Sequence, residues 1–154
     1  AVTATSTATA TATAGDTTGD AVTTTTPPDP APTTASPPLP DPTPWRSIED
    51  RYERLRVGLT AVYGWFERGA ELAACVLRDA ETHQPVKETV ALRMGPTMAA
   101  YHETLGAKLN VRQRAMLALA LSFYTWRSLV REGGLTQRAA VDAMLKAIEG
   151  INKA

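Results

Sequence analysis

The stretch VRQRAMLALALSFYTWRSLVRE, residues 111–132, decides the fold class of this chain. Apolar residues recur in it at helical spacing, and Asn110 with Gln113 has the pattern of a capping box that opens a helix. At 100° per residue the apolar side chains fall on two faces of this helix. Because such a helix needs two packing partners, we expect one partner inside the domain and one in another subunit.

The first apolar face of this predicted helix holds Met116, Leu119, Ala120, Phe123, Trp126 and Val130; the second holds Leu117, Ala118, Leu121, Thr125 and Leu129. Gly133-Gly134 predicts where the helix ends. Thr136 predicts the cap of a final helix, whose apolar stripe includes Met144 and Ile148.

Upstream, the pattern predicts four more helices. The first begins at Thr43-Pro44 and ends near Gly69, and the others cover about 69–81, 85–93 and 96–108, with breaks at His83-Gln84-Pro85 and Gly95-Pro96. No segment alternates with the period of two that a strand requires. We therefore expect an all-α bundle of about six helices.

Residues 1–44 differ in composition from the rest of the chain. They contain no basic or aromatic residue, nine of the eleven prolines and a Thr-Ala repeat, TATSTATATATA. Such a Thr/Ala/Pro-rich segment cannot bury enough apolar surface to offset the cost of ordering, so it is predicted to be a disordered tail. A glycosylated stalk is the alternative, and the pattern of a signal peptide is missing. Residues 45–154 form the predicted domain and carry a net charge of about +4, from sixteen basic and twelve acidic residues.

Few residues in this chain suggest chemistry. His83 and His102 are its only histidines, and Cys75 is its only cysteine, predicted to be a small buried residue. The chain lacks metal-ligand spacing, a phosphate-binding loop and a paired nucleophile, so we expect no metal, no cofactor and no enzyme activity. A single cysteine is typical of a reducing compartment and indicates a cytoplasmic protein. The longest apolar run, at 115–121, is too short to cross a membrane.

Direct nucleic-acid binding is not expected either. The arginines are spread along the helices and mostly alternate with acidic residues, which is typical of a solvated surface. The segment REGGLTQR resembles the turn of a helix-turn-helix only superficially, because the helix after it offers few groups suited to base edges.

Aromatic and sulfur-containing side chains on different predicted helices could converge. Either they are core, which is the better hypothesis for any one of them, or they line an adaptable pocket for an apolar ligand. The candidate ligand-binding residues are Tyr63, Phe66, Met94, Met98, Tyr101 and Phe123.

Four phrases in order carry a resemblance to a known family: PDPTPW (40–45), RYERLRVGLTAVYGWFER (51–68), ELAACVLRDAE (71–81) and LALSFYTWRSLVREGGLT (119–136). With them, residues 46–151 resemble the C-terminal ligand-binding domain of TetR/AcrR-family transcriptional regulators. The resemblance implies an effector-sensing domain that dimerises through its last two long helices and binds a small hydrophobic effector among its middle helices. The helix-turn-helix domain of the family is not present in this chain, where the Thr/Ala/Pro tail takes its place, so the chain alone is not expected to bind an operator.

The expected homodimer interface consists of Leu117, Leu121, Tyr124, Ser128, Met144 and Ile148. Within the domain, Arg127 is expected to form a structural ion pair with Asp79. One alternative is a dimerisation module without a ligand, which could also form heterodimers with intact regulators. A helical-bundle enzyme is the other.

Overall fold

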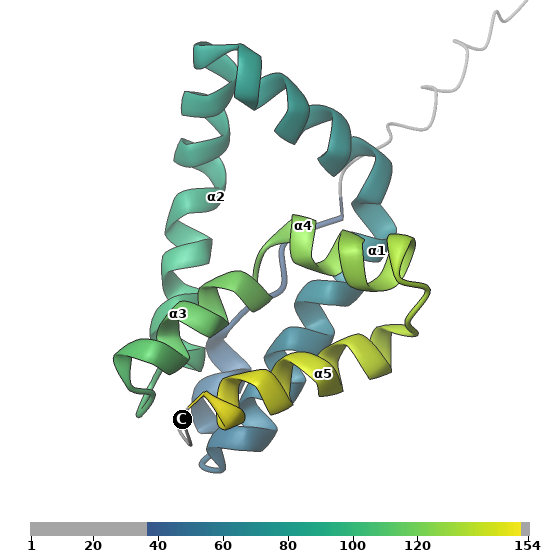
Figure 1. The fold of residues 1–154 in the computed structure, drawn as a ribbon. Helices are drawn as coiled ribbons and strands as arrows, with labels where there is room; N and C mark the ends of the chain where they lie inside the picture. Colours follow the sequence, from purple (N-terminus) through teal and green to yellow (C-terminus); the bar gives the residue numbers. More distant parts are fainter. Residues whose placement is uncertain (1–36, 152–154) are drawn as a thin grey trace, which may run out of the picture. The chain divides into compact units, whose positions relative to one another are not determined.

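The computed structural model describes residues 37–151, and all regular structure in this range is helical. Short helix η1 (Thr43–Ser47) precedes the long helices α1 (Arg51–Thr82) and α2 (Gln84–Leu105). They are followed by α3 (Val111–Ala120), α4 (Phe123–Trp126), the π-helical segment η2 (Arg127–Glu132) and α5 (Gln137–Gly150) (Figure 1). The prediction of an all-α fold is confirmed for the described residues.

Part of the segment that composition assigns to the tail packs against the helices. Residues 37–42 have no regular secondary structure but lie against α1 and α2 through hydrogen bonds to Trp65 and Tyr101. The expected disorder of residues 1–36 falls outside the described range.

Helix α1 passes through Gly69, so the predicted break there is wrong. The Asp50 side chain caps its first turn by accepting a hydrogen bond from the Glu53 backbone N–H at 2.7 Å. A glycine in a helix costs about 1 kcal/mol relative to alanine, which a helix of 32 residues with a packed N-terminal half tolerates.

Helix α2 is likewise one helix where two were predicted, since it continues through Gly95-Pro96. Both residues are exposed, so this part of the backbone is open to solvent, which can satisfy the carbonyl that Pro96 leaves without a donor. A single residue, His83, connects α1 to α2 and caps both helices.

The predicted helix 111–132 is broken after Ala120. Its capping box at Asn110 and Gln113 is confirmed, but Ser122 has extended backbone angles, φ −76° and ψ 134°, and opens α4. The break rotates α4 relative to α3. Apolar residues from both predicted faces can therefore pack against the same core. Leu117 and Leu121 are buried in the same core as Phe123, whereas Leu119 is 51% exposed.

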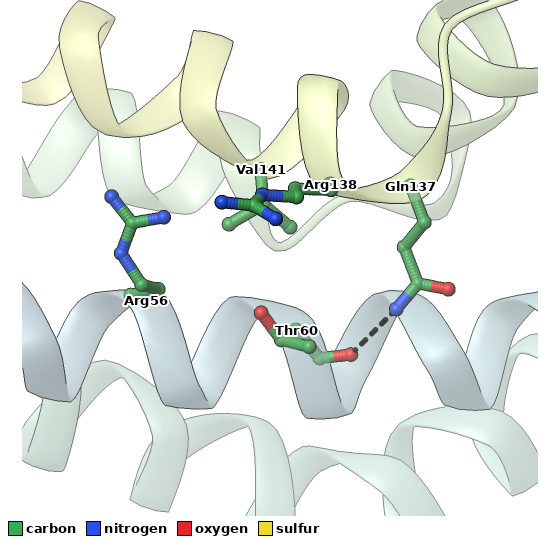
Figure 2. A pocket seen from close by; sticks show the side chains of 5 residues that line it. All are labelled: Arg56, Thr60, Gln137, Arg138 and Val141. Carbon is green, nitrogen blue, oxygen red and sulfur yellow. Dashed lines mark hydrogen bonds between the residues drawn. The ribbon is translucent and has the colours of Figure 1, made fainter.

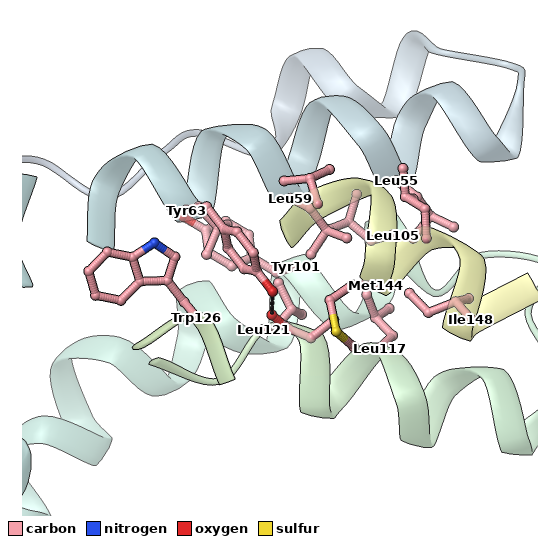
Figure 3. Close-up of a cluster of buried hydrophobic side chains, with 14 of the residues drawn as sticks. Leu55, Leu59, Tyr63, Tyr101, Leu105, Leu117, Leu121, Trp126, Met144 and Ile148 are labelled. Atoms are coloured by element: carbon pink, nitrogen blue, oxygen red, sulfur yellow. Dashed lines mark hydrogen bonds between the residues drawn. The ribbon is translucent and has the colours of Figure 1, made fainter. Parts of the chain in front are cut away.

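The core lies between α1 and the other helices (Figure 3). Its fully buried members include Leu55, Leu59, Tyr63, Tyr101, Leu105, Leu117, Leu121, Trp126, Leu145 and Ile148. The Tyr63 hydroxyl donates a 3.0 Å hydrogen bond to the Ala120 carbonyl, which ties α1 to the end of α3. Burial also raises the pKa of this hydroxyl far above its usual range.

Residues 78–97, at the end of α1 and the start of α2, form an arm outside this core. No residue from 67 to 100 is buried, and Leu92 in this arm is 82% exposed. Figure 1 shows the two helices meeting at the apex of the arm, away from α3 and α5. The arm therefore depends on the core at its base for its position.

Candidate functional site

The larger of two surface grooves lies between α1 and α5 (Figure 2). Its volume is about 430 Å³, and Arg56, Thr60, Gln137, Arg138 and Val141 line it. The Gln137 amide donates to the Thr60 carbonyl at 3.1 Å, and Arg56 pairs with Asp142 of α5 at 2.6 Å. These contacts link the two helices, so the polar walls of this groove have a structural role.

The smaller groove lies where α1 meets α4 and η2, and has a volume of about 210 Å³. We call it the Trp126 groove; Ala70, Glu71, Ala74, Phe123, Trp126, Arg127 and Arg131 line it. The apolar part of the lining consists of two alanines of α1 and the two aromatic residues of α4. Glu71, Arg127 and Arg131 are the charged residues among them. Apolar walls with a few polar groups are typical of small-molecule sites, but this groove is smaller than the roughly 300–1,000 Å³ of most such sites.

The aromatic wall of the Trp126 groove belongs to a cluster that continues into the core. Trp126 lies 5.9 Å from Phe66 and 5.4 Å from Phe123, measured between ring centroids. Phe66 and Phe123 meet edge to face at 5.4 Å. Such packing fixes the orientation of the indole and makes this wall rigid.

The indole N–H of Trp126 is the one buried donor of this wall that lacks a partner. The side chain is fully buried, and no acceptor among the described residues lies within hydrogen-bonding distance of Nε1. Leaving a buried donor unpaired costs about 1–3 kcal/mol, so each such group in a native fold requires an explanation.

The backbone next to Trp126 is also unusual. Residues 127–132 form a π-helical turn, in which Gly133 N–H donates to the Ser128 carbonyl five residues earlier at 2.8 Å. Short π-helical turns are rare and occur frequently at functional sites. In this chain the π-helical turn carries Arg127 and Arg131 to the rim of the groove.

The two arginines at the rim have exposed partners. Arg131 pairs with Glu67 at 3.0 Å and lies over the Trp126 ring, with 5.6 Å between the guanidinium carbon and the ring centroid. Arg127 pairs with Glu132 at 3.2 Å. Exposed ion pairs of this kind contribute about 0–1 kcal/mol, so both guanidinium groups can exchange partners at little cost.

Most of the residues expected to bind a ligand are packed elsewhere. Only Phe123 lines the Trp126 groove; Tyr63, Phe66 and Tyr101 are buried in the core. Met98 is half-buried against the core, and Met94 is half-buried in the arm. The structure therefore does not bring these six side chains together around one cavity within the described residues.

The residues expected at a dimer interface divide into two groups. Leu117, Leu121, Met144 and Ile148 are core residues of a single chain, at most 7% exposed, so their assignment to a surface is wrong. Tyr124 and Ser128 are exposed and hydrogen-bond Glu81 at 2.8 Å and Glu132 at 3.1 Å. The hydrogen bond to Glu81 raises the pKa of the Tyr124 hydroxyl.

The expected ion pair between Asp79 and Arg127 is not formed. Among the described residues, the carboxylate partner of Arg127 is Glu132, five residues along the same π-helical segment. Cys75, expected to be buried, is exposed on α1, whereas Ala74 and Leu77 beside it in the sequence are partly buried against the core.

Sequence reasoning missed two groups of residues. Arg54 is 6% exposed and donates to the carbonyls of Ile48 at 2.7 Å and Ala107 at 3.5 Å, which joins the start of α1 to the α2–α3 connection. Trp65 and Tyr101 donate to the carbonyls of Pro37 and Pro40. A proline-rich stretch beside a tryptophan-containing domain was the available signal for the second group.

Among residues 37–151, no helix combines the length and the apolar composition that crossing a bilayer requires. In the same range no three His, Cys, Asp or Glu side chains gather as a metal site would need. Comparison of the chain with protein-family models, with curated proteins and with solved structures finds no match.

Proposed function

We propose that this helical unit is the effector-sensing, dimerising domain of a TetR-like transcriptional regulator, and that its effector binds in the Trp126 groove. The resemblance of four ordered sequence phrases supports the family. The single observation that carries the site is the fully buried Trp126, which lines the groove with an unpaired indole N–H. The cytoplasmic location belongs to the same proposal.

The chemistry of the groove defines the effector. Phe123 lines the groove with apolar surface, and the fully buried Trp126 lies behind it, under the Arg131 guanidinium, so a ligand reaches the indole N–H when Arg131 moves aside. The indole N–H and the Arg127 and Arg131 guanidinium groups can only donate hydrogen bonds. A matching ligand therefore has a small apolar body and one acceptor group, for which a carboxylate is the best counterpart. Such a ligand replaces the weak ion pairs of the rim and satisfies the buried donor.

The binding test uses 2-naphthoate as the probe on the full chain, with calorimetry and thermal unfolding as readouts. We expect saturable binding to one site per chain and a rise in melting temperature, because a ligand at about 100 times its Kd stabilises the fold by about 2.7 kcal/mol. The Trp126→Phe variant removes only the N–H and part of the ring, and should weaken binding at least tenfold. Trp45→Phe is the matched control, since Trp45 lines neither groove.

Absence of binding to 2-naphthoate and to a panel of smaller aromatic and aliphatic acids would reject the groove as the effector site. Unchanged affinity in Trp126→Phe would reject the role of the indole N–H.

Dimerisation is proposed through the outer face of α3 and α5, which pack against each other. Val111 and Leu119 on α3 are 83% and 51% exposed, and Ala115 and Ala118 of α3 and Ala143 of α5 are exposed as well. Leu119→Arg should give monomers by light scattering while the fold is retained. Leu92→Arg on the arm is the matched control and should leave a dimer. A monomeric wild-type protein at tens of micromolar would contradict this part of the proposal.

The second candidate function is an interaction module that binds no effector. It is favoured by the packing of Tyr63, Phe66 and Tyr101 as ordinary core residues and by the small volume of the Trp126 groove. This candidate predicts a dimer without any response to the acid panel. Dimerisation with binding supports the sensor, and dimerisation without binding supports the module.

A further inference from the structure

The segment Pro37–Pro42, which we call the proline strap, lies against side chains from both long helices. The Trp65 indole N–H of α1 donates to the Pro37 carbonyl at 2.7 Å. The Tyr101 hydroxyl of α2 donates to the Pro40 carbonyl at 2.6 Å. The strap thus connects two helices through its backbone acceptors.

The sequence of the strap sets its conformation. It begins Pro-Pro-Leu-Pro, and proline fixes its own φ near −65° while it disfavours the helical region for the residue before it. These restrictions favour the polyproline II helix, which has three residues per turn. Carbonyls three residues apart therefore lie on the same side of the strap. Pro37 and Pro40 have this spacing, and in that conformation their carbonyls, which accept from Trp65 and Tyr101, lie on one face of the strap.

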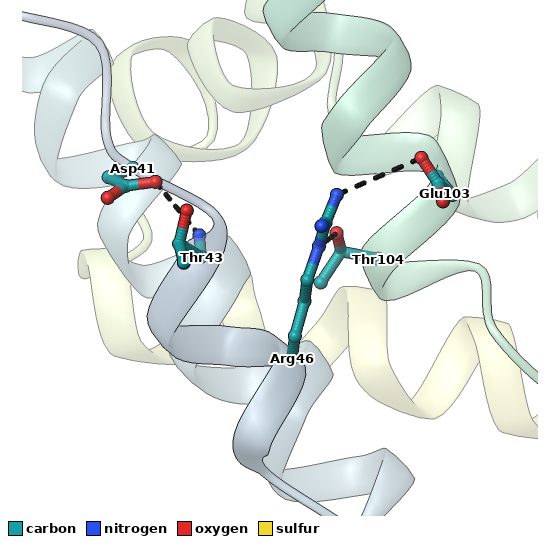
Figure 4. A network of polar contacts seen from close by, with 5 residues as sticks. All are labelled: Asp41, Thr43, Arg46, Glu103 and Thr104. Atoms are coloured by element: carbon teal, nitrogen blue, oxygen red, sulfur yellow. Dashed lines mark hydrogen bonds and ion pairs between the residues drawn. The ribbon is translucent and has the colours of Figure 1, made fainter.

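The C-terminal end of the strap is held by a separate network (Figure 4). The Asp41 carboxylate accepts from the Thr43 backbone N–H at 2.9 Å and starts η1. In η1, Arg46 donates to the Thr104 hydroxyl at 3.4 Å and lies 3.9 Å from Glu103. Trp45 stacks against Tyr101 at 5.2 Å between centroids. These contacts anchor η1 to α2 independently of the hydrogen bonds to Pro37 and Pro40.

Domains that bind PxxP segments in general use aromatic side chains that contact the proline rings, and the polar atoms of these side chains bond the exposed carbonyls. Trp65 and Tyr101 provide such a pair of aromatic side chains, each with one donor. We infer that Trp65 and Tyr101 form a recognition site for PPxP segments, that residues 37–40 are its resident intramolecular ligand, and that a PPxP segment of another chain can take their place. The inference is independent of the Trp126 groove.

Intramolecular attachment gives the strap an effective concentration in the millimolar range, so a free peptide competes poorly with it. Weakening the strap should therefore open the site. The triple variant Pro37→Ala, Pro38→Ala, Pro40→Ala keeps every backbone carbonyl but loses the preset φ angles.

The test is a titration with the synthetic peptide SPPLPDPT, which copies residues 36–43, followed by tryptophan fluorescence and by the indole N–H signals in ¹H–¹⁵N spectra. The strap variant should bind the peptide at least tenfold more tightly than the wild type. Adding Trp65→Phe to it should abolish the gain, whereas adding Tyr124→Phe, which removes a hydrogen-bonding group outside the site, should not. The peptide SAALADAT should bind neither protein.

Equal binding of the proline and alanine peptides by the strap variant, or binding of neither, would overturn the inference. If the triple variant fails to fold, the single variant Pro37→Ala decides: its Trp65 indole signal should shift on addition of millimolar SPPLPDPT and stay constant with SAALADAT. A Trp65 signal that responds to neither peptide would refute the proposed site.

Discussion

The same substitution at two glycines of α1 should have opposite effects on stability. At Gly58, an added Cβ would lie 2.5 Å from one terminal methyl of Leu105 and 2.8 Å from the other. Leu105 is fully buried and cannot move into solvent. At Gly69, by contrast, the added Cβ would have no heavy atom within 4 Å. Gly58 therefore sets the close approach of α1 to α2, and Gly69 is a free helical position.

The magnitudes follow from two terms. Alanine in place of glycine stabilises a helix by about 0.5–1 kcal/mol at either position. Overpacking a core adds a cost of about 1–3 kcal/mol, and this term applies only at Gly58. Gly69→Ala should thus raise the free energy of unfolding by about 0.5–1 kcal/mol. Gly58→Ala should lower it, and the difference between the two variants should equal the overpacking cost of about 1–3 kcal/mol.

The assay is urea unfolding followed by circular dichroism, with the m-value compared between variants so that a changed midpoint reports stability alone. Thermal midpoints should follow, at roughly 4–8 °C per kcal/mol for a domain of this size class. Equal stabilisation by both substitutions would show that α1 and α2 do not approach each other at Gly58, and would refute the packing described for the core.

Three further predictions test other parts of the structure. Arg127→Ala should change the free energy of unfolding by less than about 0.5 kcal/mol, because the ion pair between Arg127 and Glu132 is exposed. A loss of several kcal/mol in urea unfolding would instead indicate that Arg127 has a buried partner. Arg54→Lys should lower the free energy of unfolding by about 1–3 kcal/mol in the same assay, because a lysine ammonium group cannot reach both carbonyls that the Arg54 guanidinium bonds. An unchanged free energy of unfolding would contradict the buried position of Arg54. Burial, and secondarily the charge of Asp41, raises the pKa of Tyr101 to about 12. The folded state therefore holds this proton more tightly than the unfolded state, and the corresponding stability, complete below about pH 10, should be lost as the pH rises toward 12. Tyr101→Phe should remove this part of the alkaline loss of stability in urea unfolding at several pH values, and an unchanged pH profile would contradict the assignment.

The fold class could be predicted from periodicity because helical spacing is a local property of the chain. The capping box at Asn110 and the cap at Thr136 could be predicted for the same reason, and both are present. Gly69 and Pro96 misled the prediction, because a helix supported elsewhere along its length tolerates a weak position. Ser122 was the missed signal: it is a residue that favours helix starts, and it divides the helix that was expected to be continuous.

The sites were harder to predict, because they depend on which helix faces meet. In a continuous helix 111–132, Leu117 and Leu121 would face another side than Phe123 and Trp126. The break after Ala120 changes the phase between α3 and α4, so all four are buried in one core. The ion-pair partner of Arg127 depends on the π-helical turn, and no pattern in the sequence indicated that turn. The unpaired N–H of Trp126 is a property of its surroundings, and sequence alone can only indicate that the indole is buried.

The most direct test of the proposed function is a ¹H–¹⁵N spectrum of the indole N–H groups during titration with 2-naphthoate. The chain has three tryptophans, so each signal can be assigned with one Trp→Phe variant. Without ligand, the Trp126 signal should lie at the position of an N–H without a hydrogen bond, and the Trp65 signal at that of a bonded one. On titration the Trp126 signal should move downfield in a saturable manner while the Trp65 signal stays in place. A Trp126 signal that already has the shift of a bonded N–H, or that does not respond to any acid of the panel, would contradict the account.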